Sequence, residues 1–284
     1  MPAPSRRPAT WRMIFFVVFF SAAGFGSIVF SRRPSNDRHW AADHARLPRI
    51  TFADSLVTIR DFRDFRYEGG DSLVPAYENR TVDLRALDSV WLVLTPFSKA
   101  WRGPAHSFVT FGFHDSAFVS ISVEARREAG EEYGLLRGLG RNFELIYVVG
   151  AEEDLIGKRA AFGDFDVYLY PIRTTPDRAR AVFVDLLTRA QALEQHPEFY
   201  NTLANNCTSN LVASVNRVVP GRIPSGVKLL FPGYADDVAR TLGLIDSAEP
   251  LDTIRARYRI NDRARAALGT NGFSLAIRTP TGGS

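Results

Sequence analysis

The sequence contains only one cysteine, Cys207, among its 284 residues. A structural disulfide within the chain is therefore impossible, which excludes the disulfide-stapled class of secreted domains. Because this cysteine lies far from the N-terminus, the chain has no lipoprotein signal either. An unpaired thiol in an oxidising compartment tends to be lost unless it is buried or has a task. The role of Cys207 is therefore the main question that this sequence poses.

The sequence also lacks the signatures of several common protein classes. It has no G-x-S-x-G elbow, no H-E-x-x-H motif and no Walker lysine motif, which mark many serine hydrolases, zinc proteases and P-loop proteins. The formal net charge is only +4. No basic stripe with interleaved aromatic residues is present, so nucleic acid is not an expected partner. We expect no cofactor and no metal site.

The longest uncharged segment is residues 13–30, which is rich in phenylalanine and valine. As a helix rising ~1.5 Å per residue it would span roughly 27 Å, close to the thickness of a bilayer's hydrocarbon core. We expect an uncleaved transmembrane helix here; the alternative is a signal peptide cleaved near residues 21–23. Three arginines precede the segment and three follow it within residues 31–38, so charge alone does not orient it. We expect residues 1–12 in the cytoplasm.

Composition predicts the organisation of the remaining chain. With 45% hydrophobic residues and 31.7 kDa, it can hold one sizeable core. Residues 31–50 are polar and arginine-rich, which is typical of a solvated juxtamembrane linker, and His39, Asp43 and His44 within them fit no standard metal spacing. We expect an extracytoplasmic domain over residues 51–250. A C-terminal extension over residues 251–284 is expected to fray after Ala267, where Gly, Thr and Ser dominate.

Hydrophobic periodicity predicts an α+β domain, with an antiparallel sheet and helices packed against it. Residues 67–79 read as a turn-rich segment. Thr175, followed by proline, marks the start of a helix that ends before Pro197. Two further helices are expected at about 206–218 and 234–242. The predicted strands cover residues 57–62, 90–95, 107–113, 117–124, 143–149 and 166–172.

Cys207 is the candidate nucleophile. It follows Asn205 and Asn206, either of which can cap the predicted helix, so the thiol would lie in the first turn. There the positive end of the helix dipole lowers the pKa of a thiol. Unpaired backbone N–H groups at the same place can hold an oxyanion, so Asn206 is expected in the cap or the oxyanion neighbourhood. The alternative is that Cys207 is core filler, because Leu211 and Val215 share its helix face.

His106 is the expected base for this thiol. The other four histidines are expected in the linker, in a turn or at a helix end, whereas His106 opens a strand. If residues 106–113 and 117–124 pair as a hairpin in which partner numbers add up to 230, Glu124 lies opposite His106 and Ser122 is diagonal on the same face. Either side chain could orient the imidazole as the third member of a triad. A register shift of two would exchange them, and Glu124 could instead be a surface residue.

Several runs of sequence then occur together, in a fixed order. They are HSFVTFGF at 106–113, ISVEAR at 121–126, ELIYVV at 144–149, DVYLYP at 166–171 and FYNTLANNCTSN at 199–210. In these runs, and in a further one at 232–246, the chain resembles the Lnb N-terminal periplasmic domain family. The likeness covers about residues 95–246, and a similar segment upstream extends it toward residue 40.

The resemblance implies a papain-like thiol fold in circularly permuted order, with histidine before cysteine as in lecithin:retinol acyltransferase-like proteins. The family's named member is an acyltransferase that moves a fatty chain within bacterial lipoproteins. The resemblance therefore implies that the domain lies in the periplasm, and the one transmembrane helix expected over residues 13–30 would make the chain a single-pass inner-membrane protein. Cys207 would take an acyl group as a thioester while His106 relays the proton. The expected partners are the lipid bilayer, through the N-terminal helix, and lipoproteins or other acylated substrates.

Two alternatives to this function stay open. The named acyltransferase has further membrane-spanning segments beyond the domain, whereas only one is expected here, so the thiol site carries over more securely than the substrate. The first alternative is a cysteine peptidase or amidase acting on cell-wall or peptide substrates with the same residues. The second is a non-catalytic envelope binding or scaffold protein. An apolar groove beside the cysteine and histidine would favour acyl chains, and a polar cleft would favour peptides.

Overall fold

The computed structural model describes residues 13–17, 19–20, 31–67, 73–98, 101–114, 117–226, 231–246 and 248–279. Residues 13–17 and 19–20 are helical, while residues 18 and 21–30 of the expected membrane span lie outside the described residues. Among the described residues, no helix combines the length and the apolar character needed to cross a bilayer.

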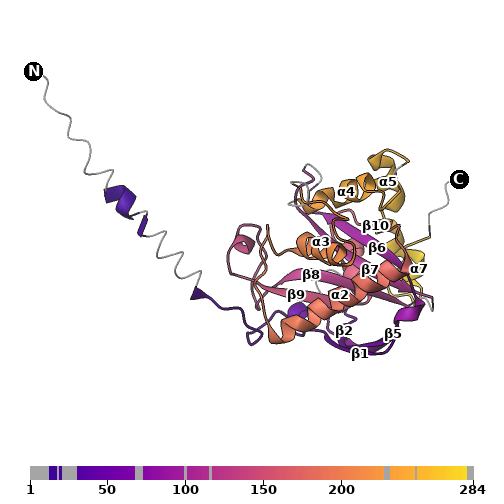
Figure 1. Cartoon of the computed structure of the whole chain (residues 1–284), viewed down its shortest axis with the longest axis horizontal. Helices are drawn as coiled ribbons and strands as arrows, with labels where there is room; N and C mark the ends of the chain where they lie inside the picture. Colours follow the sequence, from indigo (N-terminus) through magenta and orange to yellow (C-terminus); the bar gives the residue numbers. More distant parts are fainter. Residues whose placement is uncertain are drawn as a thin grey trace, which may run out of the picture.

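One eight-stranded mixed sheet forms the centre of the domain (Figure 1). Its strands follow the order β1-β2-β9-β8-β7-β6-β10, with β5 also paired to β2. All neighbours are antiparallel except β2 and β9, which are parallel and meet through Arg63 and Gly150. The bounds are β1 Arg49–Ala53, β2 Leu56–Arg63, β5 Tyr77–Asp83, β6 Leu87–Pro96, β7 Ala105–Phe113, β8 Phe118–Arg126, β9 Glu144–Gly150 and β10 Tyr168–Pro171, and a separate pair joins β3 Arg66–Tyr67 to β4 Leu73–Val74.

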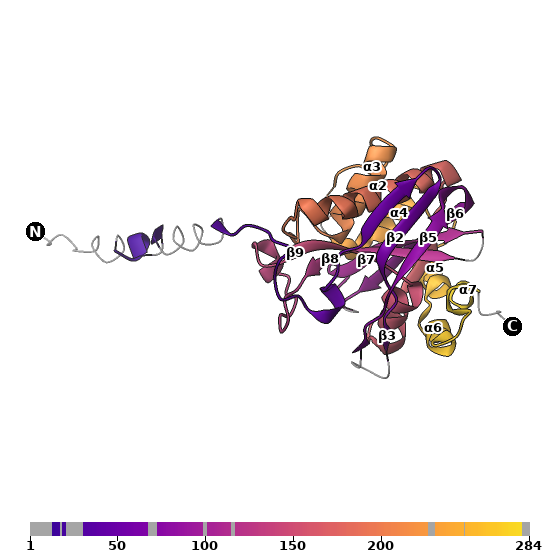
Figure 2. The same ribbon diagram turned by 90° about the horizontal axis from the view of Figure 1, so that it is seen from below.

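Helices cover both faces of this sheet, so the central strands are buried along their whole length (Figure 2). On one face lie α2 Pro176–Gln195 and α3 Cys207–Val218, whose apolar residues share a core cluster with β7, β8 and β9. On the other face, α6 Asn261–Ala267 and α7 Phe273–Ala276 pack with the π-helix η4 Glu153–Phe162. The remaining elements are α4 Ala235–Thr241, α5 Leu251–Tyr258, and the 3₁₀ turns η1 Ala42–His44, η2 Leu84–Ala86, η3 Arg137–Leu139 and η6 Pro232–Tyr234.

The observed elements confirm the expected α+β class, with a sheet and packed helices. Each predicted strand and each of the three predicted helices is present, and Thr175 caps α2 by accepting a hydrogen bond from the Arg178 N–H. The turn-rich segment 67–79 differs from expectation, because β5 begins at Tyr77 and pairs with β2. The end of the chain also differs: Phe273 and Ile277 are buried in the core, so the residues after Ala267 do not simply fray.

The expected linker, residues 31–50, packs against the domain instead of being solvated. The buried guanidinium of Arg126 requires acceptors, and it finds them in the carbonyl oxygens of His44 and Ala45 at 3.0 and 3.1 Å. It also lies 4.0 Å from the ring centroid of Trp40, a cation–π contact. His44 is only 2% exposed as a result. A segment read as solvated therefore contributes a buried histidine to the domain.

Gly150 offers a test of the β2–β9 junction, which holds this N-terminal segment beside the sheet. A Cβ atom there would lie 2.4 Å from the Arg63 carbonyl oxygen and 2.8 Å from Leu155 Cδ1. We expect Gly150→Ala to lower the free energy of unfolding by about 1–3 kcal/mol, because the strands must separate. Gly226→Ala, where a Cβ meets nothing within 4 Å, is the control in urea denaturation. Equal stability of the two variants would contradict this account.

Candidate active site

Cys207 is the first residue of α3, and Asn206 caps that helix. Asn206 Oδ1 accepts a hydrogen bond from the Ser209 N–H at 2.8 Å, and Ser209 Oγ accepts one from the Asn206 N–H, also at 2.8 Å. Asn206 Nδ2 donates to the Thr202 carbonyl oxygen at 2.6 Å. The expected helix cap is therefore Asn206. Its amide is engaged by the loop and by the helix, which positions the start of the helix, and Asn206 also lines the pocket.

The cap leaves the backbone N–H groups of Cys207 and Thr208 without a hydrogen-bond acceptor among the described residues. Such orphan donors at a helix start carry the positive end of the helix dipole. Both groups belong to the first turn, where an anion is most strongly stabilised. The backbone at Cys207 is thus arranged to favour negative charge.

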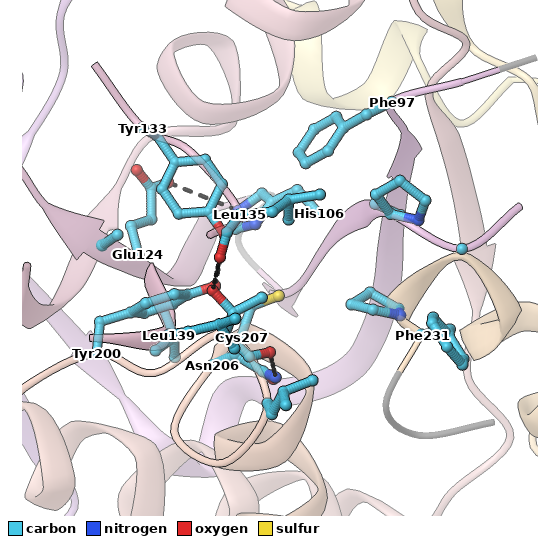
Figure 3. A pocket seen from close by; sticks show the side chains of 18 of the residues that line it. Phe97, His106, Glu124, Tyr133, Leu135, Leu139, Tyr200, Asn206, Cys207 and Phe231 are labelled. Atoms are coloured by element: carbon cyan, nitrogen blue, oxygen red, sulfur yellow. Dashed lines mark hydrogen bonds and ion pairs between the residues drawn. The ribbon is translucent and has the colours of Figure 1, made fainter. Parts of the chain in front are cut away.

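The thiol itself lies at the boundary between the core and a pocket. Cys207 is 4% exposed and belongs to the core cluster that α2 and α3 form with the sheet. Its Sγ lies 3.9 Å from Ser107 Oγ and 3.8 Å from Thr208 Oγ1. Figure 3 shows the sulfur on the pocket side of α3. Cys207 therefore packs in the core, as the core-filler interpretation predicts, and it also lines a pocket, as the nucleophile interpretation requires.

His106, Ser122 and Glu124 form a hydrogen-bonded series. His106 Nε2 lies 2.7 Å from Ser122 Oγ, and Ser122 Oγ donates to Glu124 Oε1 at 2.8 Å. A hydroxyl has one hydrogen, so Ser122 must accept from His106, and His106 carries its proton on Nε2. Nδ1 then holds the lone pair, and it has no hydrogen-bond partner among the described residues.

The register that was predicted for the hairpin explains this series. β7 and β8 pair from Val109–Ile121 to Gly112–Phe118, so partner numbers add up to 230 as expected. Glu124 and Ser122 were alternatives for the group that orients His106, and the structure brings both to the imidazole, with Glu124 Oε1 3.6 Å from Nε2. Ser122 makes the direct contact, and Glu124 acts behind it.

Glu124 is held by two residues that the sequence did not indicate. Arg159 of η4 donates from Nη2 to Glu124 Oε1 at 2.8 Å. His44 Nε2 lies 3.2 Å from Glu124 Oε2, and His44 Nδ1 accepts from the Arg127 N–H, so Nε2 carries the proton and donates. Burial alone would raise the pKa of Glu124. The charge of Arg159 and the contacts with His44 and His106 outweigh it and hold that pKa well below its usual range.

His106 is neutral at pH 7. Burial and, to a smaller extent, the charge of Arg159 lower its pKa to about 4, although the charge of Glu124 opposes them. A neutral imidazole with a free lone pair on Nδ1 can accept a proton. No hydrogen bond joins His106 to Cys207 within the described chain, but both side chains line the same pocket (Figure 3).

The pocket has a volume of about 420 Å³ and a mostly apolar wall. Tyr200, which is buried beside Cys207, shares a hydroxyl contact of 3.4 Å with Tyr133. Burial raises the pKa of Tyr200, and the neighbouring Cys207 raises it further, so its hydroxyl stays protonated and able to donate. The apolar residues of the wall include Phe97, Trp101, Ala105, Val123, Leu135, Leu136, Leu139, Leu203, Phe231 and Pro232.

Sequence reasoning missed three residues of this site for different reasons. His44 was assigned to a solvated linker, although Trp40 and Leu47 in the same segment are residues that a solvated linker rarely needs. Tyr200 stands in the same motif as Cys207 and was not given a role. Arg159 gave no signal, because η4 has no amphipathic periodicity. No cluster of three or more His, Cys, Asp or Glu side chains that could hold a metal occurs in the described ranges.

The low pKa of His106 predicts how stability depends on pH. In the unfolded chain an ordinary histidine takes up a proton near pH 6.5, whereas folded His106 resists protonation until about pH 4. Protonation therefore favours unfolding over that window, and His106 should account for roughly 2 kcal/mol of lost stability between pH 7 and pH 5. Urea denaturation of His106→Asn at both pH values should show that loss removed.

The control for this experiment is His39→Asn, because the His39 side chain is exposed. It should keep the pH dependence of the parent protein. Glu124 also loses stabilisation on acidification, but its lowered pKa shifts that loss below its unfolded value of about 4.3. Parallel pH dependence in the parent and in His106→Asn would refute a buried, neutral His106.

Comparison with known proteins places this site in a family. No curated protein and no solved structure gives a significant match. Residues 74–256 match the family model described as the Lnb N-terminal periplasmic domain. The match covers more than half of the chain and includes His106, Ser122, Glu124 and Cys207, whereas His44 lies upstream of it. A periplasmic location fits this description, and the chain belongs to the Lnb N-terminal periplasmic domain family.

Proposed function

We propose that this domain is a thiol-dependent acyltransferase or hydrolase that acts on acyl chains. The observation that carries the proposal is that Cys207 and the His106–Ser122–Glu124 series line one apolar pocket. A nucleophile at a helix start, with a neutral histidine oriented by a third group, is the arrangement of thiol acyl-transfer sites. The order of histidine before cysteine suits a circularly permuted papain-like fold.

The first chemical step is formation of a thioester. His106 Nδ1 accepts the Cys207 thiol proton, and the sulfur attacks the carbonyl carbon of an acyl ester. As the tetrahedral intermediate collapses, the carbon–oxygen bond breaks and the leaving alkoxide takes the proton from His106. The imidazolium formed in between is stabilised through Nε2–H by Ser122 and, behind it, by the negative charge of Glu124.

The second step transfers the acyl group. An amine attacks the thioester carbonyl, gives a proton to His106, and releases Cys207 as thiolate, which takes that proton back. Water in place of the amine gives hydrolysis. In both steps the oxyanion can be held by the unpaired N–H groups of Cys207 and Thr208, and the protonated hydroxyl of Tyr200 offers a third donor.

The wall of the pocket favours an acyl chain over a peptide. Most of the surface that lines the pocket is apolar, and the lining residues include four leucines, two phenylalanines and a tryptophan, which offer few partners for the amides of a peptide backbone. We propose acyl chains of lipoproteins as the substrate, with residues 13–30 anchoring the domain to the inner membrane. A membrane anchor would raise the local concentration of such a substrate.

The deep burial of Cys207 favours a second candidate, a non-catalytic envelope protein. The thiol is 4% exposed and packs in a core cluster, as a structural cysteine does. The two candidates differ in the chemistry of the thiol. A catalytic thiol reacts in the folded protein and depends on its base, whereas core filler reacts only after unfolding.

Thiol alkylation of the folded protein separates these candidates. Iodoacetamide should modify Cys207 at pH 7, and His106→Ala should slow the reaction by about tenfold or more, because the base that accepts the thiol proton is lost. His114→Ala is the matched control, since His114 follows the far end of the same strand and its side chain is exposed. A thiol that stays inert until denaturant is added would assign Cys207 to packing.

Activity can be tested with a long-chain acyl p-nitrophenyl ester as the probe. We expect release of nitrophenol and an acyl thioester on Cys207 that intact-mass spectrometry detects and hydroxylamine removes. Cys207→Ser should abolish the thioester, and His106→Ala should lower kcat/KM by about 10²–10⁴-fold. Cleavage of a peptide anilide with no reaction toward the ester would instead indicate a peptidase.

A further inference from the structure

The exposed apolar side chains of the domain are concentrated at the mouth of the pocket. Seven large side chains there are between 38% and 83% exposed, and Leu136 is the most exposed of them. Of the other exposed ones in the described domain, Phe165 lies beside Phe97, with the ring centroids 6.0 Å apart, and the rest lie one each in β1, β2, β4 and α7. We call the seven the pocket rim: Phe97, Trp101, Tyr133, Leu135, Leu136, Leu139 and Leu203.

The leucines of the pocket rim are held outward by the loop that carries Cys207. Thr202 donates from its backbone N–H to the Gly138 carbonyl and from its hydroxyl to the Leu135 carbonyl, both at 2.9 Å. Asn201 Nδ2 donates to the Leu139 carbonyl at 2.9 Å. The two loops also approach so closely that a Cβ on Gly138 would lie 2.3 Å from Thr202 Oγ1. The exposure of these leucines is therefore built into the structure.

The aromatic part of the pocket rim is fixed in the same way. The indole of Trp101 lies against Gly103, where a Cβ would come within 2.3 Å of the ring, and its centroid is 5.9 Å from that of Phe231. Contact between large apolar side chains and water is unfavourable, and a partner that covered these side chains would remove that unfavourable contact. The pocket rim is thus an interaction surface.

The N-terminal segment indicates what covers this surface. Arg32 donates from Nη1 to Asn142 Oδ1 at 2.9 Å, and Arg141 donates to the Arg32 carbonyl at 3.2 Å. The chain therefore leaves the domain beside the loop that carries the leucines, as Figures 1 and 2 both show. Upstream of this point, residues 13–30 form an uncharged sequence of eighteen residues, long enough to enter a bilayer. A membrane reached by that segment would meet the pocket rim.

The composition of the surface also fits a membrane interface. Tyrosine and tryptophan favour the boundary between headgroups and acyl chains, with leucine below it. Arg32, Arg33 and Arg141 lie in the adjoining segments and suit anionic headgroups. Arg137, in the same loop as the leucines, is paired with Glu131 instead.

We propose that the pocket rim inserts into the surface of a phospholipid bilayer, so that the pocket opens directly onto the acyl chains of the membrane. This contact is separate from the anchoring by residues 13–30. It goes beyond the proposed function, because it requires no reaction at Cys207. The occupant of the surface is the lipid bilayer itself, rather than an acylated protein.

The test uses the full chain with Cys207→Ser, so that a single new cysteine can be labelled. Leu136→Cys carries an environment-sensitive nitrobenzoxadiazole dye in vesicles of phosphatidylethanolamine and phosphatidylglycerol. We expect a blue-shifted emission, strong quenching by doxyl-labelled lipid, and iodide quenching several-fold weaker than at Leu275→Cys. Leu275 is the control because it is also exposed and lies in α7, away from the rim loops (Figures 1 and 2).

A second variant keeps the outcome decisive. Trp101→Ser in the labelled Leu136→Cys chain should weaken the shielding from iodide several-fold, while its denaturation midpoint shows that the domain stays folded. Equal iodide quenching at positions 136 and 275 would overturn the proposal. So would shielding of position 136 that arises only when an acylated lipoprotein is added, because the occupant would then be a protein.

Discussion

The carboxylate of Glu124, whose side chain is only 15% exposed, is the constraint on which the site depends. A carboxylate that is largely withdrawn from water is tolerated only when charges and donors surround it. Here they come from three parts of the chain: His44 from the N-terminal segment, Ser122 from the same strand, and Arg159 from η4. Satisfying one negative charge therefore requires the N-terminal segment, the sheet and the π-helix to assemble together.

A second buried ion pair secures the elements that bring those partners. Arg63 at the end of β2 binds both carboxylate oxygens of Asp154 in η4, at 2.7 and 2.9 Å, and also donates to the Asp43 carbonyl at 2.8 Å. A bidentate contact of this kind fixes direction as well as distance. It sets η1 and η4 against the same strand end, so His44 and Arg159 approach Glu124 from fixed positions.

The placement of a neutral hydroxyl between His106 and Glu124 has a chemical consequence. Direct contact with the carboxylate would favour the imidazolium. Both ring nitrogens would then carry a proton, and the histidine could not accept one from the thiol. Ser122 separates the two, and burial together with Arg159 keeps His106 uncharged. The carboxylate is still close enough to stabilise a positive charge that forms on the ring. The arrangement of His106, Ser122 and Glu124 thus suits both the neutral imidazole of the resting state and the imidazolium that forms as an intermediate.

Much of this arrangement could be predicted from local sequence, and the remainder could not, for physical reasons. Alternation of apolar residues and a short turn fix the β7–β8 register, so the proximity of His106, Ser122 and Glu124 followed from pairing alone. Likewise, the Asn-Cys sequence located a helix cap. His44 and Arg159 lie 80 and 35 residues from Glu124, and they reach it through tertiary contacts that no local pattern encodes. A π-helix also lacks the periodicity by which a helix face is recognised.

That π-helix makes the length of one segment critical. Its hydrogen bonds span five residues instead of four, so the ten residues of η4 wind more slowly than an α-helix between Asp154, which is bound to Arg63, and Arg159, which is bound to Glu124. Removing a single residue between these two anchors would let the segment relax to α-helical winding and turn the guanidinium toward another direction. Surface loops tolerate such deletions. Here, a change in chain length by one residue would separate Arg159 from Glu124 and remove its charge from the surroundings of His106.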